Sequence, residues 1–430
     1  MAIVAASVAA LGAAAPGAEA VPATVYAANS SVTGSISQYR AGLAGVLAPL
    51  SPPTVGAGER PQQIAVSPDG ESAYVTNLTS GSIGQHDIAP TSGALSPKTP
   101  ATVPAGASPS AITVSPDGNS LYATNAGTTG LVRQYDVAAD GTLAPKTPET
   151  LPTGGTNPFG VTVAPDGDSA YVANETGGVA QYDVAADGKL TAKAPATVAA
   201  GAAGRTVVVA PDGDSAYVTE FGLPGKVFQF NVAADGKLSA KSPASVTTAN
   251  TAHGMAVAPD GRSAYVTNNF AGVVSQFDVA ADGRLVPESP ATVGGLVNPA
   301  DIELTRDARN AYVGNGDARV SQFNVDGDGK LSPKSPPTAA AVADVSSVAV
   351  TGEAPPQPQQ PPAPDNDTPS NEFSFGKAKK NKRKGTAKLT VEVPGPGELE
   401  LAKTKKVKGD EERADATGTE KLLVKAKGKG

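Results

Sequence analysis

The sequence has 430 residues, of which 17% are charged and 4% aromatic, and its formal net charge is −7. Its 48 glycines and 38 prolines are typical of many short strands joined by tight turns. The lack of cysteine excludes disulfides, thiolate metal sites and a cysteine nucleophile. With only two histidines, His86 and His253, we expect neither a metal site nor a cofactor.

The first twenty residues are small and apolar, and Ala18-Glu19-Ala20 fits a signal-peptidase cleavage site. We therefore predict a signal peptide over residues 1–20 and a secreted or cell-surface protein. The alternative is an alanine-rich disordered leader. No later apolar run approaches 18 residues, so the sequence predicts no membrane-spanning helix.

Residues 21–353 contain seven copies of one pattern, for example "VTVAPDGDSAYVAN" at 161–174. A tyrosine recurs every 46–49 residues, and a glutamine followed by Tyr, His or Phe comes 10–12 residues later. The repeated tyrosines are Tyr26, Tyr74, Tyr122, Tyr171, Tyr217, Tyr265 and Tyr312. The copies therefore predict seven structural repeats.

Each copy predicts four strands. In the fourth copy these are 161–167, closed by a Pro-Asp-Gly turn, then 169–174, 179–184 with period-two alternation, and 189–198 after an Asp-Gly turn. Prolines in the last strand suit a sheet edge, where a missing N–H breaks no ladder bond. Four antiparallel strands in each repeat are typical of a propeller blade.

Both ends of the repeat region are incomplete in complementary ways. The region begins with a second strand, Thr24 to Asn29, and ends with a first strand, Ser346 to Glu353. Joining them completes one blade and leaves no open sheet edge. The predicted fold class is thus all-β: a seven-bladed β-propeller closed by N- and C-terminal strands in one blade.

These repeats resemble the YVTN-repeat and lactonase-like seven-bladed propellers. The resemblance rests on "AYVTN" and on "VAQYDVAADGKLTA" and covers about residues 24–353. It implies a propeller fold and, as one activity among several that such propellers have, hydrolysis of a sugar lactone of the 6-phosphogluconolactonase type.

One face of the predicted ring varies between copies, while the turn face is nearly the same in every copy. We therefore expect any site at the variable mouth of the central channel. The candidate ligand-binding residues there are Arg205, His253, Gln62 and Phe159. An arginine can hold a carboxylate or phosphate with two hydrogen bonds. The alternative is that these are ordinary polar residues at a wet channel mouth.

The resemblance also implies catalytic residues if the chain is a lactonase: an Arg, preceded by Pro and followed by His, and an Asn-Glu in the next strand. Here Arg205 lacks both neighbours, Phe221 stands at the glutamate position, and Glu220 comes one residue early. Asn174-Glu175 is intact, but in the preceding copy. The candidates are Arg205, Glu220 and Glu175, and this offset predicts at best a slow hydrolase.

Beyond the repeats, residues 354–372 read as a Pro-rich linker and residues 373–430 as a small basic β-rich segment. The segment has 16 Lys or Arg against 8 Asp or Glu. We predict a hairpin between 385–393 and 398–402, or alternatively part of an immunoglobulin-like module. Its charge suits an anionic surface, whereas the lack of interleaved aromatics argues against nucleic acid.

The leading interpretation of the sequence is an exported, monomeric binding or scaffold module at the cell envelope. Its ligand would be a small molecule or an envelope polymer that the sequence does not identify. The alternative interpretation is a lactonase-like hydrolase using Arg205 with Glu220 or Glu175.

Overall fold

The computed structural model describes residues 23–42 and 44–351, and the backbone of seven short strands between residues 374 and 426. One compact unit of the chain is Ala20–Pro355, and it contains all the repeats. The predicted signal peptide, 1–20, and linker, 354–372, lie outside the described residues. The described part of the chain contains no helix long and apolar enough to cross a membrane.

The repeats fold into seven antiparallel sheets of four strands each, so the predicted propeller is confirmed. The first strand of every sheet lines the centre of the ring. The first strands are β4 (Pro61–Val66), β8 (Pro109–Val114), β12 (Thr156–Val163), β16 (Gly204–Val209), β20 (Ala252–Val257), β24 (Asp301–Leu304) and β28 (Val345–Thr351). The second strands are β1 (Thr24–Asn29), β5 (Ser72–Asn77), β9 (Ser120–Asn125), β13 (Ser169–Thr176), β17 (Ser215–Glu220), β21 (Ser263–Asn268) and β25 (Asn310–Asn315).

The outer two strands of each sheet complete the blade. The third strands are β2 (Ser35–Ala41), β6 (Ser82–Ile88), β10 (Leu131–Val137), β14 (Val179–Val184), β18 (Lys226–Val232), β22 (Val273–Val279) and β26 (Arg319–Val325). The fourth strands are β3 (Leu47–Gly56), β7 (Leu95–Pro104), β11 (Leu143–Pro152), β15 (Leu190–Val198), β19 (Leu238–Thr247), β23 (Leu285–Gly294) and β27 (Leu331–Ala340). We number the blades by these sheets, from blade 1 (β28, β1, β2, β3) to blade 7 (β24–β27).

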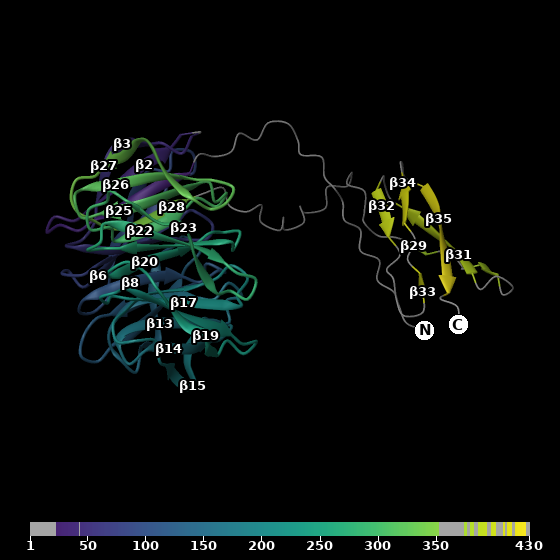
Figure 1. Ribbon diagram of the computed structural model, residues 1–430, viewed down its shortest axis with the longest axis horizontal. Coiled ribbons are helices and arrows are strands. Elements are labelled where there is room, and N and C mark those ends of the chain that lie inside the picture. Colours follow the sequence, from purple (N-terminus) through teal and green to yellow (C-terminus); the bar gives the residue numbers. More distant parts are fainter. Residues whose placement is uncertain are drawn as a thin grey trace. The chain divides into compact units, whose positions relative to one another are not determined.

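Blade 1 is built from both ends of the repeat region, as the sequence predicts. The strand β28 pairs antiparallel with β1, with Thr24 opposite Thr351. The backbone N–H of Thr24 donates to the Oγ1 of Thr351 at 3.0 Å. Figure 1 shows the green β28 among the purple strands that begin the chain. The strand β28 therefore covers the edge of β1 that would otherwise be open.

The repeated tyrosines and glutamines hold neighbouring blades together. Each tyrosine hydroxyl donates to the glycine carbonyl of the turn before the fourth strand in the next blade; Tyr74, for example, reaches Gly141 at 2.7 Å. The last copy, Tyr312, closes the circle by donating to Gly45 of blade 1. Burial raises the pKa of Tyr74 to about 12, so the hydroxyl keeps the proton that it donates.

Each glutamine side chain likewise spans two blades. In blade 1 the Gln38 Oε1 accepts from the N–H of Leu95 in blade 2 at 2.8 Å, and its Nε2 donates to the Pro52 carbonyl of its own blade. The same pattern closes between Gln322 of blade 7 and Leu47 of blade 1. Buried polar groups are stable only when hydrogen-bonded, so these bonds account for the repeat of Tyr and Gln.

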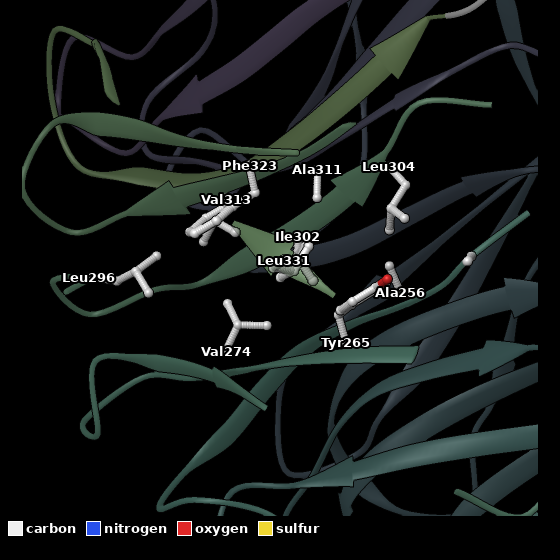
Figure 2. Close-up of a cluster of buried hydrophobic side chains, with 11 residues drawn as sticks. Ala256, Tyr265, Val274, Leu296, Ile302, Leu304, Ala311, Val313, Phe323 and Leu331 are labelled. Carbon is white, nitrogen blue, oxygen red and sulfur yellow. The ribbon is translucent and has the colours of Figure 1, made fainter. Parts of the chain in front are cut away.

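The hydrophobic core lies between the blades rather than at the centre. Seven clusters of buried side chains fill the seven seams between neighbouring sheets. Figure 2 shows the seam between blades 6 and 7, where Tyr265 and Val274 pack against Ile302, Val313 and Leu331. With the core in the seams, the centre of the ring is left open for a cavity.

The C-terminal segment is a second β-structure with a pairing that differs from the predicted hairpin. The strand β31 (Thr386–Val393) pairs with β35 (Gly418–Ala426), and β32 (Gly397–Glu400) pairs with β34 (Glu411–Ala414). The remaining strands are β29 (Ser374–Phe375), β30 (Lys379–Asn381) and β33 (Val407–Lys408). Alternation identifies a strand but not its partner, which is why the local hairpin was expected.

Candidate functional site

A cavity of about 650 Å³ lies at the centre of the ring and is lined by the first strands of all seven blades. The four candidate ligand-binding residues, Gln62, Phe159, Arg205 and His253, all line it. They come from blades 2, 4, 5 and 6, so only the closed ring brings them together. A cavity of this size with a few polar groups is suited to a small-molecule ligand.

A β-bulge near the start of the first strand turns these residues toward the cavity. The register with the second strand shifts between Gly204 and Val207 in blade 5 and between Ala252 and Met255 in blade 6. Arg205 and His253 fall within these shifts. Because a bulge places two residues opposite one, it changes the direction of a side chain that regular alternation would fix.

Arg205 is a largely buried cation that lies close to two aromatic rings. Its guanidinium carbon lies 3.9 Å from the centroid of the Phe159 ring and 4.7 Å from that of the Phe221 ring. Its side chain is 18% exposed, and its buried Nε has no hydrogen-bond partner. The two rings stabilise the cation, and its N–H groups are the part that can hydrogen-bond to a ligand.

The nearest carboxylate to Arg205 is that of Glu175, at the end of β13 in the preceding blade. The distance from Arg205 Nη2 to Glu175 Oε1 is 4.0 Å, which is an ion pair without a hydrogen bond. Asn157 Nδ2 fixes the carboxylate by donating to Glu175 Oε2 at 2.7 Å. Burial lowers the pKa of Arg205, and the Glu175 charge opposes that shift.

Glu220 lies outside the cavity, although it precedes the glutamate position implied by the resemblance by only one residue. Its Oε1 accepts from the backbone N–H of Ala202 at 2.9 Å, and its Oε2 lies 3.7 Å from Lys226 Nζ. It is the last residue of β17, where alternation directs it away from the channel. The carboxylate next to Arg205 is therefore Glu175.

His253 has the features of a base held in one orientation. Its Nδ1 is 2.8 Å from the carbonyl oxygen of Ala300, which can only accept, so Nδ1 carries the hydrogen. The lone pair is then on Nε2, which hydrogen-bonds to no described residue. Burial lowers the pKa of His253, and the charge of Arg205 lowers it further. The hydrogen bond to the Ala300 carbonyl opposes this shift. His253 is therefore neutral at pH 7.

Gln62 and His86 give less support to a ligand site than Arg205 and His253 do. The Gln62 Nε2 makes only long contacts, of 3.4 Å to Ser30 Oγ and 3.3 Å to the Pro61 carbonyl. His86 lies on β6, with Nε2 3.1 Å from the Gly56 carbonyl oxygen, and does not line the cavity. In the part of the chain that the structure describes, no three His, Asp or Glu side chains gather where they could hold a metal ion.

Sequence reasoning missed two acidic residues in the channel, Asp301 and Glu303 of β24. Glu303 is exposed to the channel, and desolvation by the surrounding strands, together with the charge of the nearby Asp301, raises the pKa of Glu303. Comparing the copies would have found it, because other blades have small residues at its place, such as Thr162 and Val208.

The sequence matches the family of seven-bladed β-propeller lactonases over residues 35–181 and 175–344. The chain therefore belongs to this family. No match to a curated protein was found.

Solved structures with the same fold include several sugar-lactonase-like proteins. The periplasmic gluconolactonase PpgL of Pseudomonas aeruginosa has a TM-score of 0.63 and 21% identity, over 77% of this chain and 99% of that one. A candidate 6-phosphogluconolactonase of Bacteroides fragilis has a TM-score of 0.65 and 20% identity, over 78% and 100%. Hydrazine synthase of Kuenenia stuttgartiensis also matches, with a TM-score of 0.53 and 20% identity over 74% and 99%. At these identities the likeness is one of fold.

Proposed function

We propose that this protein hydrolyses an anionic lactone at the mouth of the central cavity. The observation that carries the proposal is the state of Arg205: a mostly buried cation, near one carboxylate, whose buried Nε has no hydrogen-bond partner in the described part of the chain. A buried donor without an acceptor is costly, and an anionic ligand would supply the acceptor. Family membership and the lactonase-like neighbours support this alternative over a scaffold role.

The roles follow from the geometry. Arg205 binds the carboxylate or phosphate of the substrate through its free N–H edge. Glu175 balances the charge of Arg205, and its own position is fixed by Asn157. Phe159 and Phe221 keep the guanidinium in place. These residues therefore orient the lactone ring relative to His253, which lines the same cavity.

His253 provides the base. Its neutral Nε2 takes a proton from a water molecule as the water oxygen attacks the lactone carbonyl carbon. The ring C–O bond then breaks, and the proton passes from Nε2 to the departing alkoxide. The product is the open hydroxy acid. The slow rate expected from the sequence came from the offset of Arg205 from both Glu220 and Glu175. The 4.0 Å between Arg205 and Glu175, which come from adjacent blades, removes that reason for Glu175.

The test is hydrolysis of 6-phosphogluconolactone and glucono-δ-lactone by the purified protein. We expect turnover above the spontaneous rate for the phosphorylated lactone and a loss of about 100-fold or more in kcat/KM in both Arg205→Gln and His253→Asn. Arg133→Gln is the matched control, because Arg133 already pairs with Glu149 outside the cavity.

Turnover no faster than the spontaneous rate, or full activity in Arg205→Gln, would refute hydrolysis at this site. Binding that depends on Arg205 without turnover would instead support the binding module.

Two further parts of the proposal rest on the sequence alone: export, and attachment of the basic segment 373–430 to an anionic envelope polymer. Cell fractionation tests the first. Sedimentation with cell walls at low and physiological salt tests the second, because exposed charge contacts weaken with salt.

A further inference from the structure

Phenylalanines that break the repeat pattern gather around Arg205. Among the described residues of the propeller, Phe230, Phe277 and Phe323 occupy the aromatic position of the third strand, and Phe228 packs in the seam between blades 4 and 5. The other three are Phe159, Phe221 and Phe270, which come from blades 4, 5 and 6. No repeat requirement explains them, so their common location indicates a shared role.

Phe221 connects the surface to the cavity. Its ring meets the Phe270 ring edge to face, with centroids 5.6 Å apart, and meets the His253 ring in the same way at 6.1 Å. The Arg205 guanidinium lies 4.7 Å from the Phe221 centroid. Phe270, Phe221 and Arg205 therefore form a continuous apolar and cationic path from solvent into the site.

Phe270 is 70% exposed although its loop is held firmly. The backbone N–H of Phe270 donates to Thr251 Oγ1 at 2.8 Å, and the preceding Asn269 is bound through its N–H to the Thr251 carbonyl and through its side chain to the Pro299 carbonyl. A fixed loop cannot fold the ring back to cover it. The exposed surface of Phe270 is thus ready for a ligand group at the mouth.

We propose that the anion bound by Arg205 has a flat apolar group, such as an aromatic ring, directly attached, and that this group packs against Phe270 and the edge of Phe221. This inference rests on the proposed anion site and narrows its substrate class to aryl or similarly planar anions over fully hydroxylated sugar acids. A ligand whose ring lies between its charged group and solvent fits the order of contacts along this path, because Arg205 lies inside and the exposed Phe270 lies outside.

Calorimetric titration of the full-length protein with phenyl phosphate and methyl phosphate tests this. The two probes share the anionic group and differ in the ring. We expect phenyl phosphate to bind about tenfold more tightly, because aromatic contacts add to the burial of apolar surface. In Phe270→Ala we expect the difference to fall to about twofold or less, with methyl phosphate unchanged. Phe270→Leu, which keeps apolar bulk without a ring, should lie between them.

Leu223→Ala is the control, because Leu223 is a similarly exposed apolar side chain, 76% against 70% for Phe270, on the β17–β18 loop. It should leave both affinities unchanged. Equal affinities for the two probes, or a preference that survives Phe270→Ala, would overturn the aromatic inference while leaving the anion site intact. Unchanged binding of both probes in Arg205→Gln, or no binding of either to the unaltered protein, would overturn the anion site and this inference with it.

Discussion

The hydroxyl of Ser347 donates a hydrogen bond of 2.7 Å to Oδ2 of Asp301 and so joins the last blade to the blade that both ends of the chain complete. The same carboxylate oxygen accepts from the backbone N–H of Val348 at 3.2 Å. A matching contact joins blades 2 and 3, where Gln63 Oε1 accepts from the N–H of Ile112. The inner strands are therefore held at the closing seam by a side-chain acceptor.

Replacing Asp301 with alanine should weaken the closure of the ring. The substitution leaves the Val348 N–H and the Ser347 hydroxyl without their acceptor, so we expect the free energy of unfolding in urea to fall by about 1–3 kcal/mol. Asp301→Asn keeps an oxygen at that place and should lose less. An alanine variant as stable as the unaltered protein would show that the contact does not stabilise the seam.

The two candidate glutamates should behave differently in catalysis. Glu175→Gln removes the charge 4.0 Å from Arg205 Nη2, so we expect kcat/KM for the phosphorylated lactone to fall about tenfold through misplacement of the arginine. Glu220→Gln keeps the acceptor for the Ala202 N–H outside the cavity and should change activity little. The reverse order of effects would assign the catalytic carboxylate to Glu220.

The pH dependence should follow the protonation of His253. Its pKa is lowered by burial and by Arg205, so the active neutral form persists below pH 6.5 and activity is lost only as the pH falls through the lowered pKa. NMR titration can follow its ring protons, with His86 as an internal control in the same spectrum. Arg205→Gln should raise the pKa of His253 and leave that of His86 unchanged. An unmoved His253 signal would contradict the coupling.

The seam between blades 6 and 7 lacks a contact that five other blades make. In those blades a buried lysine of the fourth strand donates to a turn carbonyl of the next blade; Lys193, for example, reaches the Asp235 carbonyl at 2.7 Å. Blade 6 has Glu288 at this position, 8% exposed and 3.8 Å from Lys330 Nζ. Its carboxylate cannot donate to the next turn.

Glu288→Lys should therefore stabilise the protein. The new ammonium group would donate a hydrogen bond to the turn carbonyl of blade 7. It would also lie near Asp278, as Lys193 pairs with Asp183 in blade 4. We expect a gain of about 1–2 kcal/mol in the free energy of unfolding, measured in urea. Lys193→Glu, which copies the blade 6 situation into blade 4, should destabilise by a similar amount. A lower stability of Glu288→Lys would show that the pair with Lys330 is the better contact.

The fold could be predicted from the sequence because its signals are local and repeated. Alternation, Pro-Asp-Gly turns and the spacing from Tyr26 to Tyr312 define strands, blades and their number, and the complementary ends define the closure. Pairing between strands without such a repeat could not be predicted, as the partners of 386–393 show, because alternation does not specify which strands meet.

The site was predictable only in part. The position of Arg205, His253, Gln62 and Phe159 at one mouth follows from their equivalent places in the repeat. The contact of Arg205 with both Phe159 and Phe221 depends on bulge geometry and on the angle between blades, which no sequence spacing encodes. The channel carboxylates of β24 were visible in the sequence as departures from the other copies.

The circle of identical tyrosine and glutamine bonds has a consequence for where the chain must begin. The tyrosine and glutamine bonds are the same at every seam, so no particular blade needs to be the one in which the polypeptide is interrupted. Thr24 and Thr351 already touch through two hydrogen bonds, and a short link between them would make the backbone continuous there. New termini could then be opened in an exposed loop of another blade. A circularly permuted protein of this kind should fold with its mouth residues in place.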